Sequence, residues 1–312
     1  MSKECDERVA RVRARWEKRM KAKRIEIRKL KRELEACIKK KPNPKPKPEP
    51  PKPEPPKPDK AIKSFEVRNG KFIVNGKPII LIGCSRWKAL FLEKKWWNNW
   101  GVENLAEYEN ELIKSGINYV RHGTMPDYGF VRQHCKRMMK AGIIVELTIY
   151  NSQVNYHMGD PYEAIDATID LDNVFYDVHN EFLDHYDVDI IVPLIEYIRS
   201  KGGICSAGAW GHSPNGQRYS EMFDPIGSSN QIISVHREWT TGWITKYLGH
   251  SKPVIRNEYF DLRNSIGFGG MKRIMKETIE AGAQGCQYFM FNDNIWRERL
   301  AFAGDYCKKL NR

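Results

Sequence analysis

The sequence predicts an α/β protein whose main domain is a (β/α)8 TIM barrel, preceded by an N-terminal helix and a Pro-rich linker. Two observations favour this fold. From about residue 61 onward, strand and helix patterns alternate to the end of the chain, and eight strands can be drawn. The part of the chain after the linker has about 250 residues, which is the usual size of a single barrel of this kind.

Residues 1–41 form a basic helical arm with 17 Lys and Arg against 7 Asp and Glu. Residues 7–40 contain no Gly or Pro, and their apolar residues follow a heptad-like stripe: Val9, Trp16, Met20, Ile27, Leu30, Leu34 and Cys37. The stripe is compatible with a lone solvated helix, or with a coiled coil that self-associates or docks the protein to a larger assembly. Nucleic-acid binding is the third alternative and is not expected, because aromatic residues are not interleaved with the basic ones.

Residues 42–60 form a linker rich in Pro, Lys and Glu. Ten of the 17 residues from Pro42 to Pro58 are proline. Proline fixes φ and removes backbone donors, so the segment is predicted to be a semi-rigid polyproline II spacer. A ligand for an SH3-type domain is the alternative. Most of the net charge of +13 lies in the arm and linker, so an attraction to anionic surfaces would belong there.

Residues 61–312 are predicted to form the barrel domain. Two Asn-Gly turns, Asn69-Gly70 and Asn75-Gly76, predict a hairpin at its start. The predicted strands are 79–84, 117–121, 143–150, 174–180, 204–209, 231–236, 253–258 and 285–292. The predicted helices are 103–115, 129–141, 189–201, 239–248 and 268–281, several of them ended by glycine, while 151–173 is expected to be mostly loop. A doubly wound sheet is disfavoured because no Gly-rich phosphate loop follows the first strand.

Two glutamates stand at strand ends, where the active site of a (β/α)8 barrel lies. Glu181 follows the fourth predicted strand and Glu258 ends the seventh. Glycoside hydrolysis needs two carboxyl groups, and a separation of about 5–5.5 Å gives retention through a covalent intermediate. The two positions therefore indicate a glycosidase site.

These residues resemble the clan A glycoside hydrolases, especially the cellulase and mannanase families, over about residues 72–300. The resemblance is carried by Gly116–Arg121, Asp177–Glu181, His236, Val254–Glu258 and Trp296. It implies a retaining enzyme that cleaves a β-glycosidic bond in a poly- or oligosaccharide. Glu181 would be the acid/base and Glu258 the nucleophile, and no cofactor would be needed.

The same resemblance implies roles for neighbouring residues. Asn180 would bind the sugar 2-hydroxyl, and Arg121 would lie beside Glu258 and keep it ionised. His236 would orient a glutamate or the sugar, and Trp296 would form a platform beneath that sugar. At the end of the third strand, Tyr150 and Asn151 occupy the place where many relatives have a histidine, and they are candidate substrate-binding residues. No metal site is expected, since the acidic segment 166–172 lacks calcium-loop spacing.

Two further positions depart from the family pattern. Phe182 follows the Asn-Glu dipeptide where the family usually has proline, and Arg256 stands where an apolar residue is more usual. Strand alternation counted from Glu258 places Arg256 inside the barrel. A buried arginine needs partners, so the sequence predicts a charged cluster of Arg256 with Glu146 or Asp177 beneath the catalytic pair.

The alternative function is a non-catalytic carbohydrate-binding barrel that acts as an attachment or structural module, for example on a virion. The presence of both glutamates favours the enzyme. The seven cysteines form no C-x-x-C pair, which favours free thiols in a reducing compartment. We expect no signal peptide, no transmembrane segment and no membrane partner. The protein is therefore expected to be cytoplasmic or virion-associated.

Overall fold

The computed structural model describes residues 61–85, 104–150, 159–179, 188–206, 209–210, 231–236, 252–257, 268–289 and 296–312. All of them belong to one compact unit, Pro55–Arg312. The expected helical arm and the linker lie outside the described residues, as does the helix expected at 239–248.

The domain begins with a small antiparallel sheet of β1 (Phe65–Arg68), β2 (Lys71–Val74) and β3 (Lys77–Ile79). Both of its turns have positive φ at two successive residues: 51° and 70° at Asn69 and Gly70, and 50° and 77° at Asn75 and Gly76. This conformation suits Asn-Gly and matches the twist of the flanking strands. The hairpin predicted from the two Asn-Gly dipeptides is confirmed.

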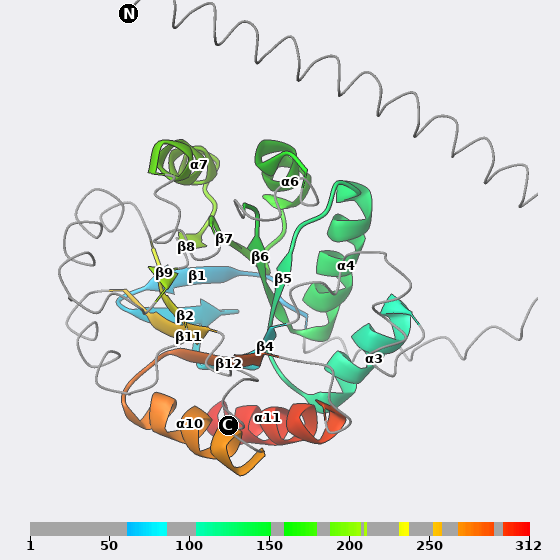
Figure 1. The fold of residues 1–312 in the computed structure, drawn as a ribbon, viewed down its shortest axis with the longest axis vertical. Helices are drawn as coiled ribbons and strands as arrows, with labels where there is room; N and C mark the ends of the chain where they lie inside the picture. The colour runs from blue at the N-terminus through cyan, green and yellow to red at the C-terminus, as the bar shows by residue number, and fades with distance from the viewer. Residues whose placement is uncertain are drawn as a thin grey trace, which may run out of the picture. The chain divides into compact units, whose positions relative to one another are not determined.

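The main sheet is parallel throughout and rolls into a nearly closed barrel (Figure 1). Its strands are β4 (Leu81–Ser85), β5 (Tyr119–Gly123), β6 (Ile144–Thr148), β7 (Val174–Asp177), β8 (Cys205–Ser206), β9 (Ala209–Trp210), β10 (Ile233–His236), β11 (Val254–Asn257) and β12 (Gly285–Phe289). The sheet order is β8-β7-β6-β5-β4-β12-β11-β10-β9. The short strands β8 and β9 both fall in or next to the predicted fifth strand, and a bridge from Ser206 to Ile232 brings the two edges together. Eight strand positions therefore surround the barrel, as predicted.

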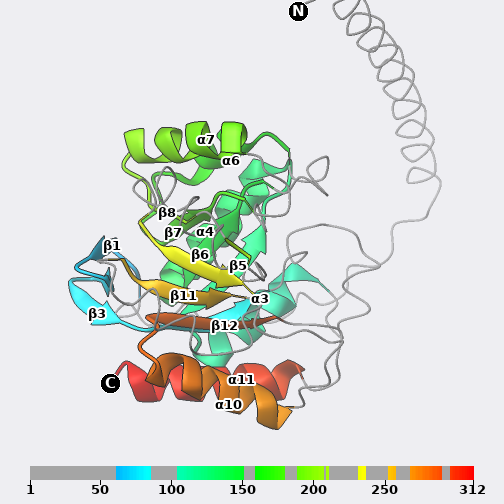
Figure 2. The same cartoon turned by 60° about the vertical axis from the view of Figure 1, so that its left-hand side comes forward.

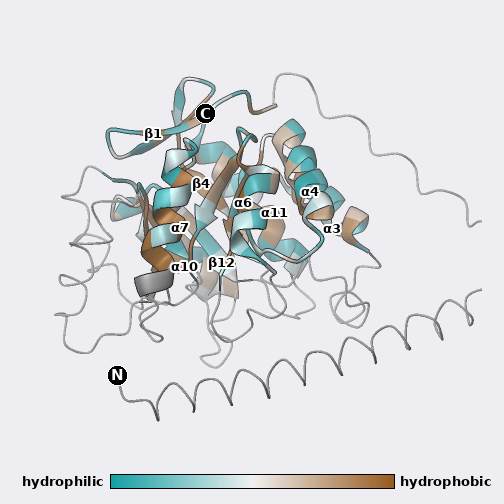
Figure 3. Cartoon of the chain, turned by 90° about the horizontal axis from the view of Figure 1, so that it is seen from above, coloured by the Kyte–Doolittle hydropathy of each residue, from teal (hydrophilic) through white to brown (hydrophobic). Residues whose placement is uncertain are grey.

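Helices lie around the outside of the barrel (Figure 1). They are α3 (Leu105–Ser115), α4 (Tyr128–Ala141), α6 (Pro161–Thr168), α7 (Val188–Ser200), α10 (Phe268–Glu280) and α11 (Trp296–Leu310). Figure 3 shows hydrophilic and hydrophobic residues alternating along them, as expected for helices that cover a sheet. The expectation of a loop over 151–173 is wrong at α6. Asp160 caps this helix by accepting a hydrogen bond from Tyr162 N at 2.8 Å, and Pro161 occupies its first turn.

Glycines end the helices where the sequence predicts. Gly116, Gly142, Gly202 and Gly282 all have positive φ, between 79° and 99°. In this conformation a glycine can stop a helix and turn the chain toward the next strand. The αβ connections of the barrel therefore follow from single residues in the sequence.

The core has two parts. The larger part lies between the strands and the surrounding helices. The second fills the amino-terminal end of the barrel, where Phe72 of the hairpin packs with strand residues such as Tyr119 and Phe175. The rings of Tyr119 and Phe175 are stacked with centroids 6.0 Å apart, and Phe65 lies 6.0 Å from Phe175. The hairpin sheet, seen at one end of the barrel in Figure 2, thus closes this end with apolar side chains.

Candidate active site

The predicted catalytic carboxylates lie just beyond the described strands. Glu181, Glu258, Asn180 and Asn151 are all outside the described residues. The description reaches His179 after β7, and Asn257 at the end of β11 is the residue immediately before Glu258. The arrangement of the two glutamates stays a prediction. The described residues show which side chains of the preceding strands lie inside the barrel.

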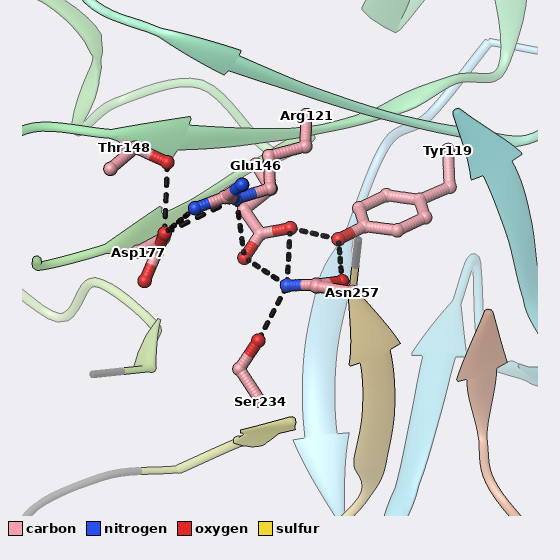
Figure 4. A network of polar contacts seen from close by, with 7 residues as sticks. All are labelled: Tyr119, Arg121, Glu146, Thr148, Asp177, Ser234 and Asn257. Carbon is pink, nitrogen blue, oxygen red and sulfur yellow. Dashed lines mark hydrogen bonds and ion pairs between the residues drawn. The ribbon is translucent and has the colours of Figure 1, made fainter. Parts of the chain in front are cut away.

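Polar side chains fill the barrel interior above the apolar plug. They point inward from five strands and contact one another (Figure 4). We call this set the polar layer: Tyr119, Arg121, Glu146, Thr148, Asp177, Ser234 and Asn257. Each of these residues is 3% exposed or less. Since buried polar groups are costly without partners, their hydrogen bonds determine what the layer can do.

One half of the polar layer is an ion pair between Arg121 and Asp177. Arg121 Nη2 lies 2.5 Å and Nε 3.2 Å from Asp177 Oδ2. The hydroxyl of Thr148 donates to the same carboxylate oxygen at 2.8 Å. Arg121 Nε is also 3.7 Å from Glu146 Oε1, so one guanidinium lies beside two carboxyl groups.

The other half of the layer joins Glu146 to the end of β11. Asn257 Nδ2 donates to Glu146 Oε1 at 3.0 Å and to Ser234 Oγ at 2.5 Å. The Tyr119 hydroxyl contacts Glu146 Oε2 and lies 3.2 Å from Asn257 Oδ1. These contacts connect β5, β6, β10 and β11, which are distant in sequence.

The charge of the layer depends on Glu146. Burial raises the pKa of Glu146 to about 8, and the opposing effect of the Arg121 charge does not cancel it. Near neutral pH most of the Glu146 side chains therefore carry a proton. Burial, with the nearby carboxyl groups, also raises the pKa of Tyr119 well above its usual value, so the phenol stays neutral. Arg121 and Asp177 then balance each other.

The predicted cluster of Arg256 with Glu146 or Asp177 is wrong. Arg256 Nη1 donates to Thr278 Oγ1 on α10 at 3.0 Å, so its side chain faces the helices. Its neighbour Asn257 faces the barrel interior, and alternation along β11 places Arg256 on the opposite side. A charged cluster does exist, but its cation is Arg121.

The other predicted site residues lie at several places in the domain. Tyr150 is half-buried after β6, with its ring centroid 4.8 Å from that of His179. His236 ends β10 and is aligned with Asn257 of β11. Trp296 begins α11, is 3% exposed and packs in the outer core. A sugar platform needs an exposed aromatic face, so burial of this extent does not favour that role for Trp296.

Four residues of the polar layer are absent from the sequence prediction: Tyr119, Thr148, Ser234 and Asn257. Strand alternation could have identified two of them, since Tyr119 and Thr148 stand two positions from Arg121 and Glu146. Asn257 lies within Val254–Glu258, one of the segments that carry the resemblance, but the resemblance implies no role for it.

The described residues contain no group of three or more His, Cys, Asp or Glu side chains arranged to bind a metal ion. A membrane-spanning helix, one sufficiently long and apolar, is likewise not found among the helices described. The polar layer instead offers a fixed cation, a fixed anion and a buried neutral acid.

No protein-family model matches the sequence, and comparison with curated proteins finds no relative. Solved structures do match. The endo-1,4-β-mannanase of Rhizomucor miehei is 13% identical with a TM-score of 0.57, over 79% of this chain and all of the mannanase. The β-mannanase of Mytilus edulis is 14% identical with a TM-score of 0.55, over 80% of this chain and 97% of the mussel protein. Gas2p of Saccharomyces cerevisiae, in a complex with laminaritetraose and laminaripentaose, is 11% identical with a TM-score of 0.54, over 79% and 68% of the two chains.

At these identities the comparisons bear on the fold. A (β/α)8 barrel matched over nearly the whole domain to glycoside hydrolases agrees with the family that the sequence motifs resemble. The (β/α)8 barrel that this resemblance implies is thus confirmed.

Proposed function

We propose that the chain is a retaining glycoside hydrolase that cleaves a β-glycosidic bond in a poly- or oligosaccharide by double displacement. The observation that carries the proposal is the position of the two glutamates. Glu258 directly follows the last residue of β11, and Glu181 follows the end of β7 by four residues. In the sequence both therefore follow strands of a (β/α)8 barrel, and this fold has its active sites at the carboxyl ends of its strands.

In this proposal Glu181 protonates the leaving oxygen and later activates water. Glu258 attacks the anomeric carbon and forms the covalent intermediate. Asn180 would bind the 2-hydroxyl of the sugar. His236, Tyr150 and Asn151 would contact the substrate from the ends of neighbouring strands.

The polar layer supports this assignment of roles. Asn257 immediately precedes Glu258, and Asp177 precedes Glu181 by four residues. Each of these two side chains is held inside the barrel by several hydrogen bonds. Such support keeps catalytic groups within a narrow range of positions. The resemblance implies that Arg121 lies beside Glu258, and the ion pair with Asp177 would hold the Arg121 guanidinium in position there.

The proposed substrate is a β-linked glycan. The structures that this fold matches include two β-mannanases and a protein bound to laminari-oligosaccharides. β-Mannan and laminarin are therefore the first polysaccharides to test, together with aryl β-glycosides of mannose and glucose.

Hydrolysis of this panel by the full chain and by Glu258→Gln and Glu181→Gln tests the proposal. Glu163→Gln is the matched control, since Glu163 is an exposed glutamate on α6. We expect activity in the wild type and the control, and a loss of at least about a hundredfold in either catalytic variant, the lower range for general acid catalysis. The anomeric proton signals of the first product should show retention.

Two outcomes would contradict the enzyme. If the wild type hydrolyses none of these substrates but binds one of the polysaccharides, the chain is the non-catalytic carbohydrate-binding module. If Glu258→Gln is as active as the control, the nucleophile is misassigned.

We further propose that residues 7–40 self-associate or dock the protein to a larger assembly. The support is the heptad-like apolar stripe within a charged segment. Sedimentation of the full chain, compared with a chain that begins at residue 61, tests this proposal. A full chain that is monomeric at all concentrations would exclude self-association.

A further inference from the structure

A ring of three hydrogen bonds closes between β5, β6 and β11 inside the barrel. The Tyr119 hydroxyl contacts Glu146 Oε2 and lies 3.2 Å from Asn257 Oδ1. Asn257 Nδ2 donates to Glu146 Oε1 at 3.0 Å. All three side chains are fully buried, so their polar atoms need partners inside the barrel.

The number of protons in this ring depends on the state of Glu146. The Tyr119 hydroxyl has one proton but lies against two oxygens, Glu146 Oε2 and Asn257 Oδ1. If Glu146 is ionised, both oxygens are acceptors and one contact has no proton. If Glu146 is a carboxylic acid, its Oε2–H donates to Tyr119, and the Tyr119 hydroxyl donates to Asn257 Oδ1. Every contact of the ring then holds one proton.

We propose that Glu146 is a positioning residue that acts as a neutral carboxylic acid and holds Asn257, and with it the carboxyl end of β11, in place for the reaction. The inference rests on the proposed function, because Glu258, which directly follows Asn257, is the proposed nucleophile. Asn257 is also held from β10, where Ser234 Oγ accepts from its amide at 2.5 Å. Three strands thus fix the last residue of β11.

The charges around Glu146 favour the acid form. On β5 it faces Arg121 and Tyr119, and on β7 it faces Asp177. The groups that contact it or its ring from β10 and β11, Ser234 and Asn257, are uncharged. Asp177 already pairs with Arg121 at 2.5 Å, so a second carboxylate beside the same guanidinium would add a buried negative charge. Burial raises the pKa of Glu146 to about 8 in agreement with this balance.

Glu146→Gln separates the acid form from the carboxylate. A glutamine presents a carbonyl acceptor and an NH2 group, and one of the two N–H bonds of that group can complete the ring in the same sense as the acid O–H. Tyr119→Phe removes one hydroxyl and keeps the aromatic side chain that stacks on Phe175. Glu146→Leu removes both polar atoms of Glu146. Glu163→Gln, on the surface of α6, is the matched control.

The first measurement is amide hydrogen exchange of β11 in the full chain at pH 7, which requires no substrate. We expect Glu146→Gln to exchange at the wild-type rate, and Tyr119→Phe and Glu146→Leu to exchange about tenfold faster, as for one lost hydrogen bond. If Glu146→Leu does not fold, Tyr119→Phe decides this arm. Faster exchange in Glu146→Gln, equal to that of Tyr119→Phe, would overturn the proposal.

The second measurement is Tm as a function of pH. Unfolded Glu146 loses its proton well below pH 7, while the folded side chain keeps it, so the wild type should lose Tm relative to Glu146→Gln as pH rises from 5 to 8. The control should follow the wild type. A difference in Tm that is constant with pH would mean that folded Glu146 is ionised, and the proposal would fail.

The third measurement is kcat and KM on an aryl β-mannoside. We expect Tyr119→Phe to lower kcat about tenfold with little change in KM, and Glu146→Gln to keep most of the wild-type kcat. A Tyr119→Phe enzyme with wild-type kcat would exclude a positioning role. If no variant, the wild type included, has activity on any glycan, the proposed function fails, and the exchange and Tm measurements still decide whether Glu146 holds β11 as an acid.

Discussion

Replacing Asp177 by asparagine should have a small effect on stability because Glu146 can compensate for it. The change removes a negative charge 2.5 Å from the Arg121 guanidinium and hardly alters the size of the side chain. Removing one partner of a buried ion pair usually costs about 3–5 kcal/mol. Glu146 Oε1, however, is 3.7 Å from Arg121 Nε and can lose its proton when Asp177 is gone.

The cost of that compensation follows from the pKa of Glu146. With a pKa of about 8, deprotonation at pH 7 costs on the order of 1 kcal/mol. The charge of Asp177 is one cause of the raised pKa, so its removal lowers this cost. We therefore expect Asp177→Asn to destabilise the fold by about 1–2 kcal/mol, well below the usual loss for a buried pair.

A double-mutant cycle measures the compensation directly. The wild type, Asp177→Asn, Glu146→Gln and the double variant are unfolded with urea at pH 7. Glu146→Gln removes the carboxyl group that could ionise, so the loss from Asp177→Asn should rise by about 2 kcal/mol in its presence. Losses that add within about 0.5 kcal/mol would refute the reasoning.

Three further predictions concern the described barrel. The unfolding free energy of the wild type relative to Glu146→Gln should be highest below about pH 4.5, fall by about 1.4 kcal/mol per pH unit and level off above about pH 8. The reason is that the folded pKa of Glu146 is raised from 4.5 to about 8. Urea titrations at several pH values check this, and a difference in unfolding free energy that does not change with pH contradicts it. Gly83→Ala should destabilise the protein by about 3 kcal/mol or more, since a Cβ there would lie 1.7 Å from the backbone oxygen of Tyr119. Gly269→Ala is the control: among the described residues, no atom beyond the backbone of its own helix and its chain neighbours lies within 4 Å of the new Cβ. This variant should be neutral or stabilising by up to about 1 kcal/mol, and equal Tm values for both variants would count against this packing. The thiol of Cys286 should resist alkylation in the native protein and react after unfolding, because burial raises its pKa to about 12; native labelling of Cys286, followed by mass spectrometry, would contradict its burial.

Local signals in the sequence were sufficient for most of the fold. The Asn-Gly dipeptides set the hairpin turns, and glycines such as Gly116 and Gly142 set the ends of helices, because the required backbone conformation admits few other residues. The helix α6 has a comparable signal in Asp160-Pro161, an N-cap followed by proline, and this signal favours a helix over a loop. The division of the fifth strand into β8 and β9 depends on contacts with both neighbours, which no local pattern encodes.

The sequence predicted that charged residues lie inside the barrel, but it did not predict which of them form pairs. Alternation correctly places Glu146 and Asp177 inside the barrel, yet counting from Glu258 assigns Arg256 to the wrong side. Glu258 follows the last residue of β11, and alternation holds only within a strand. Counting from Asn257 gives the observed direction. The identity of the partner of Arg121 depends on register between strands, which the sequence does not state.

The distance between the carboxyl carbons of Glu181 and Glu258, measured in a crystal structure of the full chain, tests the central claim most directly. A retaining glycosidase requires about 5–5.5 Å, with both groups open to one substrate-sized pocket at the carboxyl ends of β7 and β11. This is the result we predict. A distance of about 6.5–9.5 Å would indicate an inverting enzyme, and glutamates further apart, or buried away from solvent, would contradict the proposed active site.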